Sequence, residues 1–557
     1  MSKKNARLIY LPLGGAGEIG MNCYVYGYGP AGRERYIIVD LGVTFPDMET
    51  TPGVDLILPD ISWIEQRKDR LEAIFITHAH EDHIGAIGHL WGRLGAPIHA
   101  RAFTAHIARL KFEEHGLDEL AIRTVGAWPE KVQAGPFEVG FVPVSHSIPE
   151  SSSLVIDTPA GRIVHTGDFK LDETPGVGEP FAPALWAEIA EPGVRALVCD
   201  STNVFSPHPG RSESSVGPAI EELVAGAGGM VVATTFASNI ARVKTLAEAG
   251  RAAGRSVVLL GRAMRRMITA GVETGILTDF PPTIAPEDAA DVPRENLLVL
   301  ATGSQGEHRA ATAQLSRGKY MGLSLREGDL FLFSSKTIPG NEKSVARVVN
   351  AFSEMGVEVV DDHTDRYHVS GHANRPDLER MHRLLKPRLV IPMHGEHRHL
   401  REHVKLAAEN GIGGIIAPNG AMVDLSGAQA RLVEHVETGR IYLDGSVQIG
   451  AFDGVVRERI RMARNGHVVA TLILEDDRPL GDVWCETMGL PESGLSRVPL
   501  VEVLEEEANR ALRRAGRKTL ADDDRLSEEL RRVLRRSAGS EIGRNPEVTV
   551  IISRLSG

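Results

Sequence analysis

THAHEDH, residues 77–83, follows the apolar run LEAIFI and holds three histidines and an aspartate within six positions. His78 and His80 are two residues apart, so in extended backbone their side chains point to the same side and can share a metal ion. Asp82 and His83 come where apolar residues begin to recur every three or four positions, which predicts the start of a helix. A strand, a short loop and a helix are therefore expected to carry a metal-binding cluster.

A metal site of this kind needs ligands from elsewhere in the chain. Imidazole and carboxylate groups suit zinc or a similar divalent ion, and one short motif cannot complete a four-ligand site with an open position. Three further candidates follow apolar runs: His146 in PVSHS, Asp168 in VHTGD and His394 in IPMHG. Singly, each has an ordinary explanation, as a hydrogen-bonded histidine or a turn aspartate. Beside HxHxDH, which leaves coordination positions to fill, metal ligation is the better interpretation.

Changes in the strand and helix pattern along the chain indicate several domains. Short apolar runs separated by glycine and proline predict strands in the first 200 residues. Longer units then alternate buried strands with helices, which predicts a parallel, doubly wound sheet. After this segment the pattern of short strands seen in the first 200 residues returns. We expect a first domain, an insertion, the return of the first domain, a linker and a small C-terminal α/β domain, at residues 1–210, 211–364, 365–448, 449–464 and 465–557.

Loops after four strands of the expected insertion are rich in small, hydroxyl and amide residues: TTFASN, GRAMRR, TGSQGE and SSKTIPGNE. In doubly wound sheets such loops form ligand crevices. Each loop by itself is ordinary turn chemistry. Their recurrence at the same end of the strands, with arginines and lysines nearby, favours a phosphate-binding face.

The composition limits the class of protein. The chain has 557 residues and a net charge of −12, so a polyanion must be met by a local basic groove rather than by overall charge. Its three cysteines, Cys23, Cys199 and Cys485, form no close pair, which indicates neither a disulfide framework nor a thiolate zinc site. Neither a signal peptide nor an apolar run of membrane-spanning length is evident. A cytoplasmic protein with no membrane association is expected.

The expected metal ligands together resemble those of the metallo-β-lactamase fold. The resemblance rests on HAHEDH, His146 and Asp168, with Asp40 in VDLG, and it implies an αββα sandwich. One metal would bind His78, His80, His146 and Asp168. The other would bind Asp82, His83, Asp168 and His394. Asp40 would orient the ligands or hydroxide.

Residues farther along the chain indicate the substrate class. Asp200 in CDSTN, His372 in HVSGHA and His394 in PMHGEHR resemble three extra motifs of the β-CASP nucleases, the nucleic-acid-processing branch of this fold. The doubly wound segment lies between Asp200 and His372, as the inserted domain of that family would. Separately these residues fit a helix cap, a turn histidine and a surface histidine, but the coincidence of all three is a weaker explanation.

LPLGGAGEIGMN near the start and GRNPEVTVIISRL near the end extend the resemblance to ribonuclease J over essentially the whole chain. This implies a ribonuclease of RNA maturation and decay with two divalent ions, zinc first and manganese as the alternative. It also implies 5′-to-3′ digestion of single-stranded RNA from a 5′-monophosphate end, with internal cuts left open. The family tends to dimerise through its C-terminal domain, so a homodimer or a dimer of dimers is expected, with RNA-decay complexes as candidate partners.

The resemblance also implies roles for individual residues. Two metal ions would supply a nucleophile at neutral pH, while His372 would hydrogen-bond the scissile phosphate. The residues expected to act in catalysis are Asp40, Asp82, Asp200 and His372. The residues expected to bind substrate are His368, Ser370, Gly371, His372 and Ala373 of HVSGHA, with Ser335 and Lys336 of the facing SSKTIPGNE loop.

Three other functions fit parts of the sequence. A small-molecule metallohydrolase would share HxHxDH but would not need the long insertion or His372. A DNA-directed β-CASP nuclease is harder to separate, because discrimination by the 2′-hydroxyl depends on the shape of the binding site. A non-catalytic scaffold or RNA-binding subunit would be expected to have lost ligands, and none is missing here.

Overall fold

The computed structural model describes residues 6–361 and 366–555, and it divides into two compact units. The larger unit is formed by Met1–Thr44 and Leu58–Gly439, and the smaller unit by Phe45–Ile57 and Arg440–Gly557. The larger unit holds both the sandwich and the insertion, so the domain limits proposed from the sequence stay predictions.

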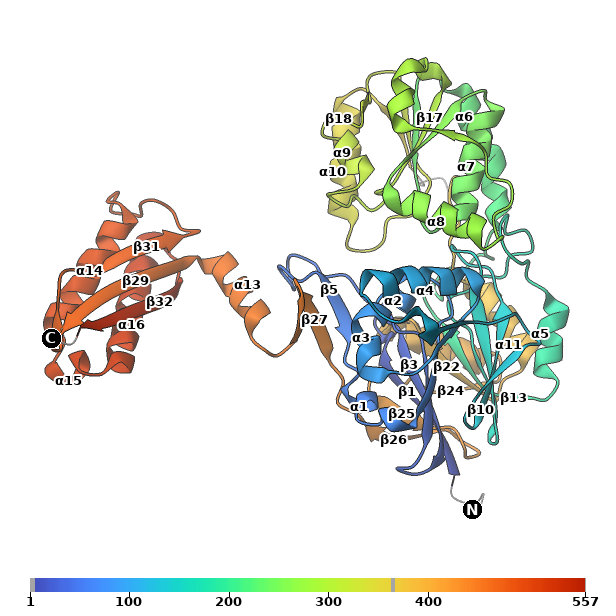
Figure 1. The fold of residues 1–557 in the computed structure, drawn as a ribbon, viewed down its shortest axis with the longest axis horizontal. Helices are drawn as coiled ribbons and strands as arrows, with labels where there is room; N and C mark the ends of the chain where they lie inside the picture. Colours follow the sequence, from blue (N-terminus) through green and yellow to red (C-terminus); the bar gives the residue numbers. More distant parts are fainter. Residues whose placement is uncertain (1–5, 362–365, 556–557) are drawn as a thin grey trace. The chain divides into compact units, whose positions relative to one another are not determined.

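Two β-sheets form the sandwich of the larger unit (Figure 1). The eight-stranded sheet has the order β26 (Arg431–His435), β25 (Ala421–Asp424), β1 (Ala6–Gly14), β3 (Cys23–Pro30), β4 (Arg35–Val39), β6 (Leu71–Phe75), β7 (Ile98–Ala100) and β8 (Ile122–Thr124). The seven-stranded sheet has the order β24 (Gly413–Gly414), β22 (Leu389–Met393), β13 (Val194–Asp200), β12 (Gly161–His165), β11 (Ser152–Thr158), β10 (Phe137–Pro143) and β9 (Lys131–Ala134).

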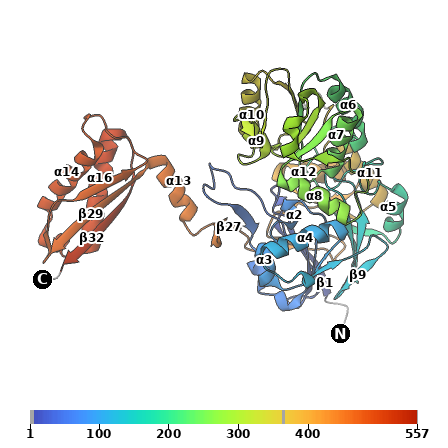
Figure 2. The same ribbon diagram turned by 45° about the horizontal axis from the view of Figure 1, so that its top comes forward.

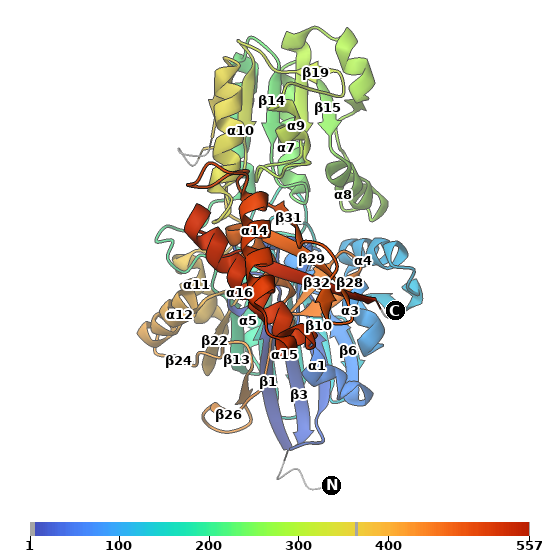
Figure 3. The ribbon, with the colours of Figure 1, turned by 90° about the vertical axis from the view of Figure 1, so that its left-hand side faces the viewer.

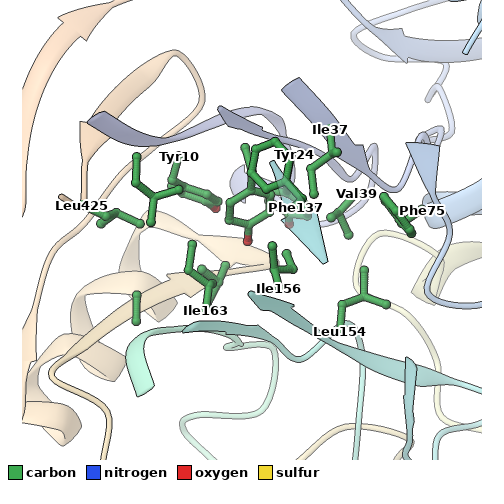
Figure 4. Close-up of a cluster of buried hydrophobic side chains, with 14 of the residues drawn as sticks. Tyr10, Tyr24, Ile37, Val39, Phe75, Phe137, Leu154, Ile156, Ile163 and Leu425 are labelled. Carbon is green, nitrogen blue, oxygen red and sulfur yellow. The ribbon is translucent and has the colours of Figure 1, made fainter. Parts of the chain in front are cut away.

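Aromatic and aliphatic side chains fill the space between the two sheets (Figure 4). Strand alternation sends Leu8 and Tyr10 of β1 into the same buried cluster as Phe137 of β10 and Ile156 of β11. Full burial of one such side chain contributes roughly 1.5–3 kcal/mol to stability. This apolar layer holds the strands rigidly, so their ends can support polar side chains in fixed positions.

Strand direction brings many strand ends to one edge of each sheet. In the first sheet, β4 and β6 are parallel. In the second, β12, β13 and β22 are parallel, and β10 runs the same way because β11 is antiparallel to both β10 and β12. The carboxyl ends of such strands are where ligand sites form in α/β sheets.

Helices cover the outer face of each sheet (Figures 1 and 2). On the first sheet lie α3 (Ile87–Leu94) and α4 (Ala102–Glu114), and on the second α5 (Pro183–Ala190), α11 (Arg375–Leu385) and α12 (His397–Glu409). Apolar residues of the last three helices form another buried layer against their sheet. The helical pattern expected after THAHEDH is confirmed as α2 (Glu81–Ile84) followed by α3. Among the described residues, no helix is both long and apolar enough to cross a bilayer.

The insertion folds as a separate parallel sheet flanked by helices, as predicted (Figure 3). Its strands have the order β16 (Thr283–Ile284), β15 (Ser256–Leu260), β17 (Leu297–Ala301), β14 (Val231–Thr234), β20 (Leu330–Phe333) and β21 (Glu358–Val360). Its helices are α6 (Gly217–Gly226), α7 (Ile240–Ala252), α8 (Arg262–Glu273), α9 (Ala311–Leu315) and α10 (Glu342–Glu354). Figure 2 shows α8 beside α4 of the sandwich, where Arg266 pairs with Glu114.

The smaller unit has a core of its own. Its sheet contains β30 (Arg478–Pro479), β29 (His467–Glu475), β31 (Trp484–Met488) and β32 (Glu547–Leu555). Apolar residues of α14 (Leu500–Arg514) and α16 (Asp523–Ile542) pack against this sheet, which confirms the small C-terminal α/β domain expected from the sequence. The expected linker, 449–464, contains most of α13 (Val455–Asn465). Before this helix, β27 (Arg440–Asp444) pairs with β28 (Val447–Gly450).

A buried pair of histidines joins α11 and α12. His382 Nε2 lies 3.2 Å from His403 Nε2, and both side chains are almost fully buried. Burial lowers the pKa of His382 to about 4, and the nearby Arg383 guanidinium acts in the same direction. Burial also lowers the pKa of His403. Both rings are therefore uncharged in the folded protein at neutral pH.

Acidification should destabilise the protein through this pair. The pKa of His382 is near 6.5 in the unfolded chain, so protons bind the unfolded state first as the pH falls. Above about pH 6.5 His382 is neutral in both the folded and the unfolded state, and its contribution to the free energy of unfolding is fully present. Between about pH 6.5 and about pH 4 the free energy of unfolding falls by about 3 kcal/mol, because the unfolded chain binds a proton that the folded protein does not. His382→Gln stays uncharged, so its free energy of unfolding, measured in urea, should fall less on acidification than that of the wild type. His435→Gln, on an exposed strand, is the control, and equal pH dependence of all three proteins would contradict the prediction.

Candidate metal centre

Every metal ligand expected from the sequence follows a strand at the carboxyl edge of the sandwich. His78 and His80 lie in the loop after β6, and Asp82 and His83 lie in α2. The others come directly or shortly after β10, β12 and β22, in that order, and are His146, Asp168 and His394. The backbone φ of His394 is 48°, in the left-handed region that side-chain-bearing residues rarely occupy. Such strain is frequent at functional sites, where the surrounding structure holds it.

The first cluster consists of His78, His80 and His146. His80 Nδ1 lies 3.2 Å from His78 Nε2 and 3.0 Å from His146 Nε2. Three converging nitrogens cannot all be satisfied by hydrogen bonds to one another, because a neutral imidazole has a single donor. Nitrogens bound at about 2.0–2.1 Å in a tetrahedron are about 3.3 Å apart, so the spacing fits a divalent ion between them. Burial lowers the pKa of His78 and of His146 and keeps both in the neutral form that binds metal.

The second cluster consists of Asp82, His83, Asp168 and His394, whose candidate ligand atoms lie within 4.8 Å of one another. Asp82 Oδ2 is 3.6 Å from His83 Nε2 and 3.3 Å from His394 Nε2, and Asp168 Oδ2 is 3.2 Å from His83 Nε2. His394 Nε2 is buried and makes no hydrogen bond within the described chain. Two carboxylates and two imidazoles fit a divalent ion of the zinc or manganese type.

Asp168 lies between the two clusters. Its Oδ2 is 3.7 Å from His146 Nε2 and 3.9 Å from His78 Nε2, while its Oδ1 accepts a hydrogen bond of 2.6 Å from His394 Nδ1. Burial favours the neutral carboxyl, but the surrounding histidines lower the pKa of Asp168 well below its usual range. Burial opposes a charge on His394, but Asp168 outweighs it and raises the pKa of His394 to about 10. A buried anion that neighbours two ligand clusters is suited to bridging two cations.

Asp40, which follows β4, holds the THAHEDH segment in place. Its Oδ1 accepts a hydrogen bond of 2.7 Å from Thr77 N, and its Oδ2 accepts hydrogen bonds from Thr77 Oγ1 at 2.9 Å and His83 Nδ1 at 2.7 Å. Its backbone φ is 62°, also left-handed. Gly42 allows the close approach of this segment, because a Cβ there would lie 1.7 Å from Asp82 O. The VDLG motif therefore positions other residues.

Two further residues touch the ligands although the sequence did not single them out. Asn22 Nδ2 lies 3.0 Å from His83 Nε2 and donates a hydrogen bond of 3.1 Å to Asp82 O. Ser238 Oγ, from the loop between β14 and α7, lies 3.1 Å from His80 Nε2. Asn22 lies in LPLGGAGEIGMN and Ser238 in TTFASN. Asparagine and serine are common turn residues, so nothing in the sequence indicates that Asn22 and Ser238 contact candidate metal ligands.

His372 and Asp200 form a pair beside the clusters. His372 Nδ1 lies 2.7 Å from Asp200 Oδ2 and 4.0 Å from Asp168 Oδ2. Asp200 Oδ1 accepts hydrogen bonds from Thr202 N at 2.9 Å and Thr202 Oγ1 at 2.7 Å, which fixes the carboxylate. Burial opposes a charge on His372, but Asp200 and then Asp168 raise its pKa. With His394, these residues also form a third set of candidate ligand atoms.

Three residues of HVSGHA have contacts within the protein. Gly371 O accepts a hydrogen bond of 2.6 Å from His146 Nδ1, and a Cβ at Gly371 would lie 2.8 Å from that nitrogen. Ser370 Oγ accepts a hydrogen bond of 2.8 Å from Asn203 Nδ2. The Ala373 side chain is buried in the apolar layer under the helices of the second sheet. These contacts account for the glycine and the alanine, and substrate binding by this segment stays a prediction.

His368 lies among cations. Burial lowers the pKa of His368 to about 3, and the charges of Arg242, Lys170 and Lys336 act in the same direction. Ser335 Oγ is buried and has no hydrogen-bond partner in the described part of the chain. Arg242 and Lys170 pair with the carboxylates of Glu213 and Asp172. The Ser335 hydroxyl and the ammonium of the adjacent Lys336 are groups that can bind an anion such as phosphate.

Four family models match successive parts of the chain. Their descriptions are the metallo-beta-lactamase superfamily for residues 16–222, the ribonuclease J beta-CASP domain for 228–352, the Zn-dependent metallo-hydrolase RNA specificity domain for 356–418 and the ribonuclease J C-terminal domain for 454–555. They confirm the expected combination of a sandwich, an inserted β-CASP domain and a C-terminal domain.

Known proteins resemble the chain over nearly its whole length. Ribonuclease J of Sinorhizobium meliloti is 40% identical over 99% of this chain and 98% of its own length. Ribonuclease J of Mycolicibacterium smegmatis is 37% identical over 98% of this chain and 96% of its own length. A crystal structure of a protein of unknown function from Enterococcus faecalis V583 aligns over 75% of this chain and 100% of that chain, with a TM-score of 0.50 and 18% identity. At that identity, the crystal structure supports the fold alone.

Proposed function

The chain belongs to the ribonuclease J family of metal-dependent ribonucleases, and we propose that it digests single-stranded RNA from a 5′-monophosphorylated end in the 5′-to-3′ direction, with two divalent ions. The observation that carries this proposal is the single buried carboxylate of Asp168 between two ligand clusters. Paired ions of this kind stabilise both the attacking and the leaving oxygen in phosphodiester hydrolysis. One site would be formed by His78, His80, His146 and Asp168. The other would be formed by Asp82, His83, Asp168 and His394.

The protein's part in the reaction is to orient these ligands, and burial keeps His78 and His146 in the neutral form. Divalent ions bound there would make water nucleophilic at neutral pH and neutralise charge on the phosphate. Asp40 holds His83 at Nδ1, so that Nε2 faces the second cluster. The mixed nitrogen and oxygen donors suit zinc, with manganese as the alternative.

His372 is proposed to bind the scissile phosphate. Its Nδ1 is engaged by Asp200, so Nε2 is the nitrogen left for a phosphate oxygen. Although burial acts against it, the carboxylates of Asp200 and Asp168 raise the pKa of His372. A donor held in this way stabilises the negative charge that develops on phosphate oxygens in the transition state.

The 5′ end is proposed to bind at His368, Ser370, Ser335 and Lys336. The support is the positive charge of Lys336 near His368 and the buried hydroxyl of Ser335, which has no hydrogen-bond partner among the described residues. A terminal monophosphate carries more negative charge than an internal phosphodiester and can accept several charge-assisted hydrogen bonds. A phosphate-binding site here would favour a monophosphate over an uncharged hydroxyl end, and it is proposed to exclude the bulkier triphosphate.

The test uses one RNA prepared with a 5′ monophosphate, triphosphate or hydroxyl and labelled at its 3′ end. We expect the monophosphorylated RNA to be degraded at least about tenfold faster than the RNAs with a triphosphate or a hydroxyl end. A tenfold difference corresponds to the free energy of roughly one charge-assisted hydrogen bond. Labelled products should shorten progressively. A circular RNA reports internal cleavage, and DNA of the same sequence reports sugar discrimination. Equal rates for the three ends, or immediate release of the label as a mononucleotide, would contradict the proposed direction.

A homodimer or dimer of dimers in a reducing, cytoplasmic environment is part of the same proposal, with RNA-decay proteins as partners. The sheet of the smaller unit leaves Trp484 and Met488 exposed, and exposed apolar side chains of this size support an interface. Cys23, Cys199 and Cys485 are buried free thiols. The molar mass of the purified protein, from light scattering, decides the state of assembly.

A further inference from the structure

Each histidine of a metal site has a second ring nitrogen, whose partner sets the tautomer and the orientation of the ring. His78 Nδ1 lies 3.0 Å from Thr77 Oγ1, and His83 Nδ1 lies 2.7 Å from Asp40 Oδ2. Both partners belong to the sandwich, in or next to the strands that carry the ligands. These two rings are therefore oriented by the domain that holds them.

The other two rings of the first cluster have partners from a different part of the chain. His80 presents Nδ1 to the cluster, and its Nε2 lies 3.1 Å from the hydroxyl of Ser238 in the insertion. With Nδ1 bound to a metal ion, Nε2 carries the proton and donates it to Ser238 Oγ. His146 Nδ1 donates to Gly371 O at 2.6 Å, in the segment that returns from the insertion.

We propose that Ser238 is a positioning residue of the metal centre and that the ion at the first cluster is held tightly only while the insertion is docked on the sandwich. This inference rests on the proposed function of the clusters as metal sites. It assigns to the insertion a role in assembling the metal centre, in addition to any contact with RNA.

Ser238 is suited to this role because the loop that bears it is anchored on both sides. The loop connects β14 to α7. Before Ser238, Thr235 Oγ1 donates a hydrogen bond of 3.0 Å to Ser334 O. After it, Asn239 Oδ1 caps α7 by accepting a hydrogen bond of 3.0 Å from Arg242 N. The hydroxyl of Ser238 therefore moves with the insertion as a body.

Arg242 links this loop to the segment that holds His146. Its fully buried guanidinium donates to the two carboxylate oxygens of Glu213, at 2.6 and 3.1 Å, and to Tyr367 O at 2.9 Å. Tyr367 lies four residues before Gly371. A bidentate pair of this kind has little geometric freedom. Displacement of α7 would therefore disturb the outer partners of both rings together.

Linkage makes the coupling reciprocal: if docking of the insertion strengthens metal binding, metal binding must strengthen docking to the same extent. Loss of an outer partner of a metal-bound histidine typically lowers metal affinity about 10- to 100-fold. Both consequences can be measured without RNA.

The experiment compares metal-free wild-type protein with Ser238→Ala, Ser238→Thr and Ser353→Ala. Each full-length protein is titrated with Zn2+ against a chromophoric chelator. We expect Ser238→Ala to bind the tighter ion about 10- to 100-fold more weakly, while Ser238→Thr keeps the hydroxyl and most of the affinity. Ser353 is an exposed serine on α10 of the same domain, so Ser353→Ala should equal the wild type. Amide hydrogen exchange at 235–240 should slow when Zn2+ is added to the wild type but not to Ser238→Ala.

Wild-type zinc affinity in Ser238→Ala, or equal slowing of exchange in both proteins, would overturn the inference. Equal weakening in Ser353→Ala would also overturn it, because the effect would then be general. Failure of the wild type to cleave RNA would contradict the proposed function but leave these zinc measurements standing. Conversely, if the wild type cleaves RNA and Ser238→Ala binds zinc normally, the proposed coupling between the insertion and the metal centre is contradicted and the proposed function stands.

Discussion

Asp168→Asn is expected to lower the rate of RNA hydrolysis at least about 1000-fold while the protein stays folded. The amide has the size of the carboxylate, but it carries no charge and replaces one acceptor oxygen by a donor. The carboxylate oxygens now lie 2.6 Å from His394 Nδ1 and 3.2 Å from His83 Nε2. Loss of one transition-state donor costs about 100- to 1000-fold. Loss of a ligand shared by two ions should cost more, because both clusters are weakened at once.

The measurement is the rate on 5′-monophosphorylated RNA at saturating Mn2+ or Zn2+, together with metal content per chain and circular dichroism. Asp157→Asn is the matched control. It makes the same chemical change on β11, toward the opposite edge of the same sheet, where the carboxylate pairs with Arg162 and Lys131. That variant should retain nearly the full rate. An Asp168→Asn protein with more than about a tenth of the wild-type rate would exclude the bridging role, since that loss is smaller than the loss of one transition-state donor.

His372→Ala should lower kcat about 100- to 1000-fold without changing metal content. In the proposed mechanism this ring donates to the scissile phosphate and is held at Nδ1 by Asp200, at 2.7 Å. Its removal takes away a hydrogen bond that strengthens as charge develops on the phosphate. KM should change much less, because substrate bound in the ground state has less need of that donor. Asp200→Asn should shift kcat in the same direction, since it removes the group that orients the ring.

The metal content of His372→Ala distinguishes phosphate binding by His372 from metal ligation by the same ring. Asp168, Asp200, His372 and His394 also form a set of candidate ligand atoms within 4.8 Å. Loss of a metal ion from His372→Ala would make His372 a ligand and contradict its assignment to the phosphate. His435→Ala, which removes an exposed imidazole on β26, should match the wild type in both rate and metal content.

The candidate metal ligands could be predicted from the sequence because their chemistry is unusual and the spacing of the first four is local. Two histidines separated by one residue and followed by an Asp-His pair are hard to explain by ordinary structural roles. His146, Asp168 and His394 could be added because each follows an apolar strand, and the parallel strands bring these ends together. The hydrophobic alternation that predicts the sandwich and the insertion is equally local.

The supporting residues were not accessible in the same way. Asn22, Ser238 and Gly371 belong to types that occur in every turn, and each acts through a partner far away in sequence. Ser238 is 158 positions from His80, and Gly371 is 225 from His146. Nothing in their immediate neighbours indicates those partners, because the contacts exist only in the folded chain, and that of Ser238 exists only where the insertion packs on the sandwich.

Periodicity, composition and short motifs along the chain were enough to predict the fold class and the order of domains, and to name a set of candidate ligands. Three features become visible only in the folded chain: which nitrogen of each ring faces its cluster, the place of Asp168 between the two clusters, and the contact of His80 with Ser238 of the insertion. The physical reason is that a hydrogen bond depends on the position and direction of two groups in space. For Asp168 those positions are set by the strands of the sandwich, and for Ser238 they are set by the packing of the insertion on the sandwich.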